Sequence, residues 1–206
     1  VLFRSGTDPT LNASLAMAIE KAKAANMPSA NIQRAIDRVA DKSAAALEEI
    51  TYEGYGPGGV GIIIETATDN RNRTLPEVKT ALVKNGGRIA DAGSVAFQFT
   101  RKGVIVVEGV GEELLLQVLD AGAEDAVEED GEIIVYTGLK ELASVRNKLV
   151  EQGLSVKDAE LRYIANTPVE IADSETAQKL MKVVDALDDL DDVVNVHTNA
   201  DITADV

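Results

Sequence analysis

The chain has 206 residues, of which 45% are hydrophobic and 3% aromatic, so alanine, valine, isoleucine and leucine must fill its core. It contains no cysteine, which excludes a disulfide framework, a thiolate zinc site and a cysteine nucleophile. Its net charge of −15 is uneven: residues 1–102 carry 13 Lys and Arg against 11 Asp and Glu, and residues 103–206 carry 7 against 24. A polyanion would therefore meet the first half of the chain, unless the acidic surface serves only solubility.

Two helices are predicted in the first 45 residues. The apolar residues of the first recur at helical spacing: Leu11, Leu15 and Ile19, with Ala18 and Ala22 beside them. The second carries Ile32, Ile36 and Val39 on one face, with Ser29 or Asn31 as its cap. Two short helices with one apolar stripe each need a partner surface, which predicts a helical hairpin. A linker is expected at 41–49.

From residue 49 the apolar spacing changes to that of strands. Ile50 and Tyr52 alternate with polar residues, a Gly-Pro-Gly-Gly turn follows at 56–59, and residues 60–66 form an almost continuous apolar run. Such a run predicts a central strand that is buried on both faces.

A helix and another strand follow in this region. Thr74 and Glu77 have the spacing of a capping box, which predicts a helix that begins at Thr74 and ends at Gly86-Gly87. Val95, Phe97 and Phe99 then alternate, which predicts a strand with these three side chains on its core face.

The next elements are predicted in the order β-α-β-β-α-β. A strand at 103–108 and a helix at 112–121 precede two strands joined by an Asp-Gly turn at 130–131. A helix at 139–151 and a strand at 156–165 complete the unit, whose order is that of a ferredoxin-like domain. One more helix at 174–187 and a strand at 193–197 follow, and we expect this pair to return to the sheet that begins near residue 49.

The predicted fold class is therefore α+β with three domains. A helical domain spans 1–47 and is truncated at its N-terminus, since the chain does not begin with Met. A discontinuous α+β domain spans 48–102 and 166–206, and a ferredoxin-like domain at 103–165 is inserted in it.

The glycine-rich stretch at 54–59 formally matches G-x-G-x-x-G, but a strand rather than a helix follows it. A dinucleotide fingerprint needs the helix, so a hairpin turn is the favoured interpretation. Glycine would also let the backbone approach a partner closely, with stackable tyrosines beside it. The candidate contacts of this loop are Tyr52, Tyr55, Gly56, Gly58 and Gly59.

The segment Thr68-Asp69-Asn70-Arg71-Asn72-Arg73-Thr74 ends a buried strand and opens a helix. Its arginines and asparagines suit phosphates or base edges beside a positive helix terminus. Alternatively, Asp69 and Asn70 make a local turn and the arginines pair with nearby acids. The candidate nucleic-acid contacts are Asn70, Arg71, Asn72 and Arg73, joined by Lys79, Lys84, Arg88, Arg101 and Lys102.

No catalytic or metal site is predicted. The run of aspartates at 185–192 lacks the spacing of an EF-hand and is expected to be a solvated helix end. His197 is the only histidine, and it is expected to be a plain strand residue. Because no nucleophile and base are paired in the sequence, we expect a protein that is not an enzyme and needs no cofactor or metal.

Several of these strings together resemble the YebC/PmpR family of probable transcriptional regulatory proteins. The matching pieces, in order, lie at 22–28, 31–36, 52–60, 68–74, 86–87, 93–97 and 101–103. The resemblance implies the three-domain fold above and a cytoplasmic protein. Two departures are the absence of the family's basic N-terminal segment and an alanine-rich stretch at 39–47.

The resemblance implies a nucleic-acid-binding regulator of gene expression. Some relatives resemble DNA-binding transcriptional regulators, whereas others resemble translation factors that ease ribosome stalling at proline-rich stretches. The expected partners are DNA or ribosomal RNA, with ribosomal proteins as further candidates, no membrane, and a monomeric chain. A third alternative is a protein-interaction module whose acidic half docks a basic partner.

Overall fold

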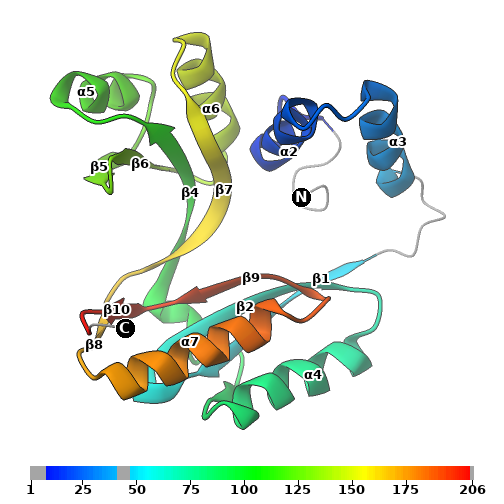
Figure 1. The fold of residues 1–206 in the computed structure, drawn as a ribbon, viewed down its shortest axis with the longest axis vertical. Coiled ribbons are helices and arrows are strands. Elements are labelled where there is room, and N and C mark those ends of the chain that lie inside the picture. The colour runs from blue at the N-terminus through cyan, green and yellow to red at the C-terminus, as the bar shows by residue number, and fades with distance from the viewer. Residues whose placement is uncertain (1–7, 41–46, 205–206) are drawn as a thin grey trace. The chain divides into compact units, whose positions relative to one another are not determined.

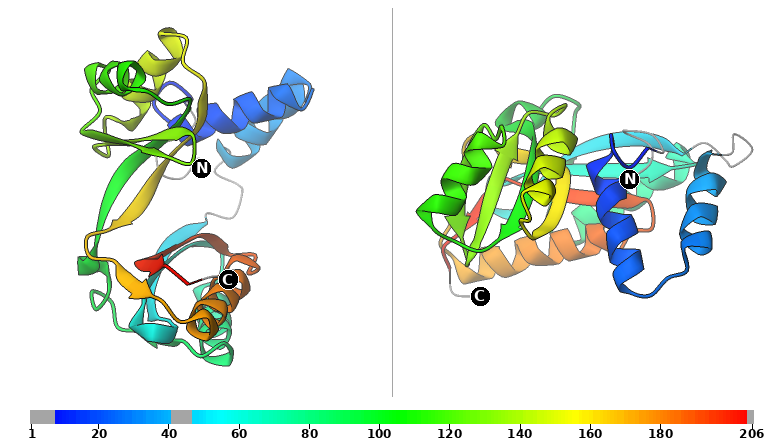
Figure 2. Two further views of the ribbon diagram at one scale, coloured as in Figure 1. Left: turned by 60° about the vertical axis from the view of Figure 1, so that its left-hand side comes forward. Right: turned by 90° about the horizontal axis from the view of Figure 1, so that it is seen from above.

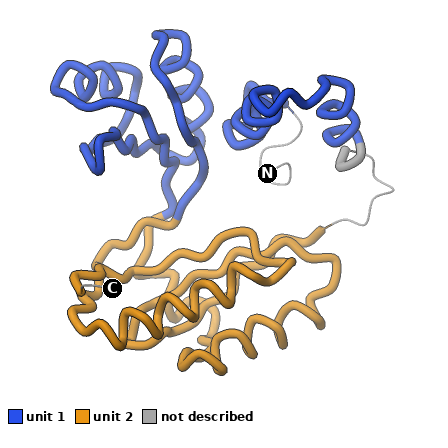
Figure 3. The backbone as a smooth tube through the Cα atoms, in the orientation of Figure 1, with its two compact units in different colours: residues 1–44, 101–162 blue, residues 45–100, 163–206 orange. Residues whose placement is uncertain are grey.

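The computed structural model describes residues 8–40 and 47–204, without the side chains of 38–40. The chain folds as a mixture of helices and mainly antiparallel sheets and divides into two compact units (Figure 3). Unit 1 comprises residues 1–44 and 101–162, and unit 2 comprises residues 45–100 and 163–206. The predicted start of the chain and most of the predicted linker lie outside the described residues.

Unit 2 is built on a four-stranded sheet in the order β3-β1-β2-β9. Figure 1 labels β1, β2 and β9 of this sheet. Its strands are β1 (Glu48–Tyr55), β2 (Gly61–Thr68), β3 (Arg88–Ala90) and β9 (Val193–Thr198). β1 and β2 form an antiparallel hairpin that pairs Glu48 with Thr68 at one end and Tyr55 with Gly61 at the other. A short 3-10 turn, η1 (Pro57–Gly59), closes the hairpin, as predicted.

Both faces of this sheet are covered within unit 2. Helices α4 (Arg71–Lys84) and α7 (Ser174–Asp188) lie on one face, where Ile62, Ile64 and Val78 form a core with apolar side chains of α7. Ile63 points to the opposite face and packs with Val95 and Phe99. The prediction that β2 is buried on both faces is confirmed, because the alternating side chains of one strand enter two cores.

Two further strands of unit 2 form a small parallel pair, β8 (Val169–Ile171) and β10 (Ala200–Ile202). Neither these strands nor β3 was predicted. Three residues are too short a stretch to show a hydrophobic period.

Unit 1 contains the second four-stranded sheet, in the order β5-β6-β4-β7. Its elements are β4 (Phe99–Glu108), α5 (Glu112–Asp120), β5 (Asp125–Glu129), β6 (Glu132–Thr137), α6 (Leu142–Glu151) and β7 (Val156–Ala165). Strands β4 and β7 continue covalently into unit 2. The Asp-Gly hairpin is confirmed: Asp130 and Gly131 both have positive φ, 49° and 83°, as a two-residue hairpin of mirror-image type requires.

The helices α2 (Ala13–Ala24) and α3 (Ser29–Ala40) form a helical hairpin (Figure 2). Helix α2 packs Ala13 and Met17 into the core of unit 1, and Ser14 donates a hydrogen bond to the carbonyl of Ala159 in β7. The expected buried stripe was partly wrong, since Leu11 is 68% exposed. The buried side chains of α2 are instead Leu15, as expected, together with Ala13, Ala16 and Met17. On α3, Ile32 is buried, whereas the Val39 side chain lies outside the described residues.

The predicted strand over 95–99 is wrong. Residues Ala96–Gln98 form a 3-10 turn, η2, and Phe97 is exposed, while β4 begins only at Phe99. The physical reason is the carboxylate of Glu53, which accepts hydrogen bonds from the amides of Val95 and Ala96. Those amides therefore bond to a side chain instead of a neighbouring strand.

The predicted start of α4 is also wrong. The helix begins at Arg71 and is capped by Asn70, whose side chain accepts from the amides of Asn72 and Arg73. Thr74 lies inside the helix and is buried. No helix of the described residues is long and apolar enough to cross a membrane.

Candidate nucleic-acid interface

The junction of β2 and α4 is organised around one buried carboxylate, Asp192, which is 8% exposed. Its Oδ2 accepts hydrogen bonds from the hydroxyls of Thr68 at 3.0 Å and Thr74 at 2.7 Å. Nη2 of Arg73 donates to both carboxylate oxygens at 2.8 and 2.9 Å. The end of β2, the first turn of α4 and the start of β9 are thereby joined at one point.

The charges at this junction stabilise one another. Burial by itself would raise the pKa of Asp192, but hydrogen bonds from Thr74, Arg73 and Thr68 outweigh it and hold the pKa below its ordinary value. Asp192, Asp69 and their hydrogen bonds raise the pKa of Arg73. Arg73 pairs with Asp69 and Asp192, and the side chain of Asn70 caps α4. For Arg73 this agrees with the alternative interpretation, in which the arginines pair with nearby acids.

Arg71 and Asn72 lie on the exposed surface of the first turn of α4. The Arg71 side chain is 65% exposed, and its contact with the carboxylate of Glu48 is long, at 3.5 Å. Ion pairs of this kind contribute little and exchange readily with solvent or a ligand. Arg71 is therefore the arginine of this segment that is free to meet a phosphate.

The other cations of unit 2 follow along α4 and into β3, and Lys79, Lys84 and Arg88 are all exposed. At about 100° per residue, Arg71 and Lys79 lie on one side of α4, and Arg73 and Lys84 lie on the other. The guanidinium of Arg88 is stacked over the ring of Tyr55, 4.5 Å from its centroid.

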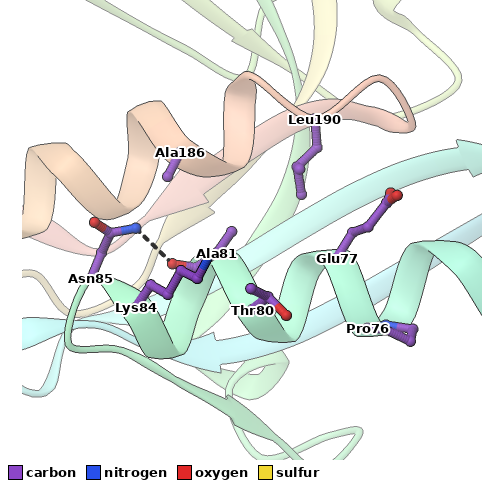
Figure 4. A pocket seen from close by; sticks show the side chains of 8 residues that line it. All are labelled: Pro76, Glu77, Thr80, Ala81, Lys84, Asn85, Ala186 and Leu190. Atoms are coloured by element: carbon purple, nitrogen blue, oxygen red, sulfur yellow. Dashed lines mark hydrogen bonds between the residues drawn. The ribbon is translucent and has the colours of Figure 1, made fainter.

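A shallow groove of about 380 Å³ runs between α4 and α7 (Figure 4). Glu77, Thr80 and Lys84 line it from α4, and Ala186 and Leu190 line it from the opposite side. The Asn85 side chain at its end is bonded to the carbonyl of Ala81. With one cation and one anion in its lining, the groove has no charge that selects a ligand.

Arg101 and Lys102 belong to unit 1, so the structure groups them apart from the α4 cations. Nζ of Lys102 lies 3.4 Å from a carboxylate oxygen of Glu124 and 5.9 Å from the ring centroid of Tyr136. Its charge is thus partly neutralised within the unit.

The glycine-rich loop lies at the opposite end of the β1–β2 hairpin from Arg71. Gly58 and Gly59 have positive φ, 73° and 78°, and a Cβ on Gly58 would come within 2.6 Å of Ile171. A Cβ on Gly56 would likewise meet Leu180 at 2.9 Å. These glycines are required by the packing of the hairpin turn, whatever else the loop does.

Neither tyrosine of this region is a free platform. Tyr52 lies within β1 against the core under α7, and burial raises the pKa of its hydroxyl. Tyr55 is half-buried, and its hydroxyl donates to the carbonyl of Ser94 at 2.9 Å.

Sequence reasoning missed the buried polar residues of unit 2. Glu53 accepts three backbone amides, and Glu65, which is 1% exposed, accepts from Asn195 and lies 3.1 Å from Nε2 of His197. Asn199 is 1% exposed and bonds to the amide of Gly61 and to Gln98. A charged residue inside an apolar strand, as Glu65 is, was the only available signal.

The acidic run at 185–192 is not uniformly solvated, because Asp192 is buried as described above. Burial, and then repulsion from Asp185 and Asp189, raise the pKa of Asp188. Within residues 8–40 and 47–204, no three acidic or histidine side chains are grouped so that they could hold a metal ion.

Comparison with known proteins identifies relatives along almost the whole chain. Residues 1–42 match the TACO1/YebC protein N-terminal domain, and residues 47–200 match the TACO1/YebC second and third domain. A probable transcriptional regulatory protein of Herpetosiphon aurantiacus is 48% identical over 203 residues, which are 96% of this chain and 80% of that protein. One of Moorella thermoacetica is 48% identical over 205 residues, covering 97% and 81% of the two chains.

The fold has been seen in a crystal structure as well. A conserved hypothetical protein from Aquifex aeolicus superposes with a TM-score of 0.85 at 41% identity, covering 98% of this chain and 85% of that one. The relatives carry names of regulatory proteins rather than enzymes. The resemblance stated from the sequence is therefore confirmed, and the chain belongs to the TACO1/YebC family.

Proposed function

We propose that this protein is a cytoplasmic, nucleic-acid-binding regulator of gene expression that contacts the sugar–phosphate backbone through α4 and β3. The observation that carries the proposal is the distribution of charge in unit 2. This unit contains 7 Lys and Arg against 17 Asp and Glu, yet residues 71–88 hold five of the seven cations and a single acid. An exposed positive segment on an otherwise acidic unit attracts a polyanion to one place.

Within this segment we assign different roles to the residues predicted as contacts. Arg71, Asn72, Lys79, Lys84 and Arg88 would meet phosphates, whereas Arg73 and Asn70 would hold the first turn of α4 in position. Arg101 and Lys102 would add contacts from unit 1. The names of the curated relatives, probable transcriptional regulatory proteins, support a partner of this class.

The three-domain arrangement predicted from the sequence belongs to the same proposal. The order of elements in residues 103–165 is that of a ferredoxin-like domain, and its excess of acidic residues would repel rather than bind a nucleic acid.

Fluorescence anisotropy with labelled duplex and single-stranded oligonucleotides, measured over a salt series, tests the proposal. The double variant Arg71→Ala/Lys79→Ala removes two exposed cations, so we expect weaker binding and a plot of log K against log salt whose slope falls by about 2 for duplex. The loss should be the same for all sequences, because phosphates carry no sequence information.

The matched control is Lys179→Ala/Lys182→Ala on α7, which changes the net charge equally but lies outside the positive segment. Equal losses for the two double variants would mean that overall charge, and not this surface, governs binding. Unchanged binding by Arg71→Ala/Lys79→Ala would remove the proposed surface altogether.

A further inference from the structure

Phe97 is the most exposed large apolar side chain in the described part of the chain, at 73%. A buried phenylalanine stabilises a fold because its ring is removed from water, and an exposed ring such as that of Phe97 does not contribute in this way. A single exposed apolar residue on a loose loop would call for no explanation. Phe97, however, lies at the centre of the short turn η2, which is firmly anchored.

The entry to the turn is held by a buried carboxylate. Glu53, 7% exposed, accepts hydrogen bonds from the amides of Gly93 at 2.6 Å, Val95 at 2.6 Å and Ala96 at 2.9 Å. Burial would raise the pKa of Glu53, but these three bonds outweigh it and lower the pKa. Val95 itself is fully buried and fixes the turn against the sheet.

The exit from the turn is held equally well. The side-chain Nδ2 of Asn166 donates a hydrogen bond to the carbonyl of Phe97 at 3.3 Å, and the backbone amide of Asn166 donates to the carbonyl of Gln98 at 2.8 Å. The Gln98 side chain in turn accepts from the buried Asn199 at 2.7 Å. Polar groups on both sides thus fix the backbone that presents an exposed ring.

The exposed cation Arg88 is connected to the same loop through Tyr55. Tyr55 donates its hydroxyl to Ser94, within the loop that leads to Phe97, and carries the guanidinium of Arg88 on its ring. Tyr55 thus contacts both Arg88 and the loop that leads to Phe97. An aromatic ring and a cation are the two groups that a base and its neighbouring phosphate require.

We propose that Phe97 is a stacking platform for an unpaired base of a single-stranded nucleic acid, with Arg88 near the adjoining phosphate. Bases within a duplex are stacked on each other, whereas an unpaired base can lie on a pre-positioned aromatic ring. This inference rests on the proposed function and narrows it to single-stranded segments. RNA and single-stranded DNA offer the same base faces, so both are probes below.

The first experiment uses the absence of tryptophan from the chain. In the Phe97→Trp variant of this 206-residue chain the new indole is the only one, and we expect its fluorescence to be quenched, saturably, by 12-nucleotide single strands of uridine or thymidine. A duplex of equal length should quench it little. Leu116→Trp, at a 58% exposed position on α5 of unit 1, is the matched control and should not respond.

The second experiment separates stacking from apolar contact. Phe97→Leu keeps an apolar side chain but loses the aromatic face, and we expect single-strand affinity to fall about tenfold, with Phe97→Trp restoring it. An oligonucleotide made entirely of abasic sites should bind the wild type and Phe97→Leu equally, because no base remains to stack.

The outcomes distinguish this inference from the proposed function. If the wild type binds nucleic acid and Phe97→Leu binds single strands just as well, the stacking platform is overturned while the α4 surface stands. If Phe97→Leu weakens single-strand binding but Arg71→Ala/Lys79→Ala does not, the platform stands and the α4 surface is wrong. Absence of any binding by the wild type overturns both.

Discussion

Among the described residues of unit 2, three carboxylates are almost completely buried: Glu53, Glu65 and Asp192. A buried charge is tolerated only when hydrogen bonds replace the water that it loses. Glu53 is satisfied by backbone amides, Glu65 by side chains of β9, and Asp192 by two hydroxyls and a guanidinium. In each case the carboxylate joins elements that are far apart in the sequence.

At this scale we predict that Asp192→Asn lowers the free energy of unfolding by about 2 kcal/mol, measured by urea denaturation at neutral pH. The amide offers a single acceptor oxygen where Thr68, Thr74 and Arg73 now share a carboxylate.

The matched control is Asp69→Asn, because Asp69 also pairs with Arg73 but is half exposed. It should change stability by less than about 1 kcal/mol. Equal effects of the two substitutions would show that the buried network contributes no more than a surface ion pair.

The difference in stability between wild type and Asp192→Asn should depend on pH. Because the pKa of Asp192 is lower in the folded state than its ordinary value of 3.8, its contribution is fully present above that value and is lost as the pH falls through the folded pKa. The stability difference between wild type and Asp192→Asn should therefore be constant at pH 5–7 and shrink below about pH 4.

At the scale of the element, α4 shows how a cap decides where a helix begins. Asn70 and Thr74 both precede plausible first turns, and the capping-box spacing favours Thr74. In the folded protein Thr74 is drawn into the network of Asp192, so the helix extends back to Asn70. This extension places Arg71 and Arg73 in the first turn, on different sides of the helix.

We predict that Asn70→Ala destabilises the protein by about 1 kcal/mol, because the amides of Asn72 and Arg73 lose their acceptor. Asn70→Asp should retain most of the stability, since a carboxylate also accepts these bonds and suits the positive helix terminus. Thermal unfolding followed by circular dichroism would measure both variants. Equal destabilisation by Ala and Asp would argue that the Asn70 side chain does not cap α4.

At the scale of the whole molecule, the uneven distribution of charge bears on which nucleic acid the protein binds in the cell. A DNA-binding regulator and a ribosome-associated factor both need a positive surface, so charge does not distinguish these two functions. They differ in whether the protein binds DNA or ribosomal RNA. Phe97, as a single-strand platform, leads us to expect RNA as the principal partner.

We therefore predict that the full-length protein co-sediments with ribosomes through a sucrose gradient and is released by RNase and not by DNase. The expected dependence on salt is steep, because counterions are released on binding. Sedimentation with DNA that ends on DNase treatment would instead favour transcriptional regulation and contradict the expected RNA partner.

Much of the fold could be predicted from local patterns. The burial of β2 on both faces follows from its continuous run of apolar residues. The turn at Asp130-Gly131 follows from the backbone preference of these two residues for positive φ. The candidate site was only partly predictable. The segment 68–74 was identified, but the sequence contained nothing to separate Arg71 from Arg73.

By itself the sequence determined the family, the mixed α and β class and the stretch in which the cations of unit 2 are concentrated. Only the tertiary structure decided that Asp192 engages Arg73, that Glu53 turns the predicted strand at Phe97 into an exposed turn, and that Met17 rather than Leu11 packs α2 into the core of unit 1. The reason is physical: each decision depends on partners 42 to 119 residues away or on another element, and local periodicity contains no information about them.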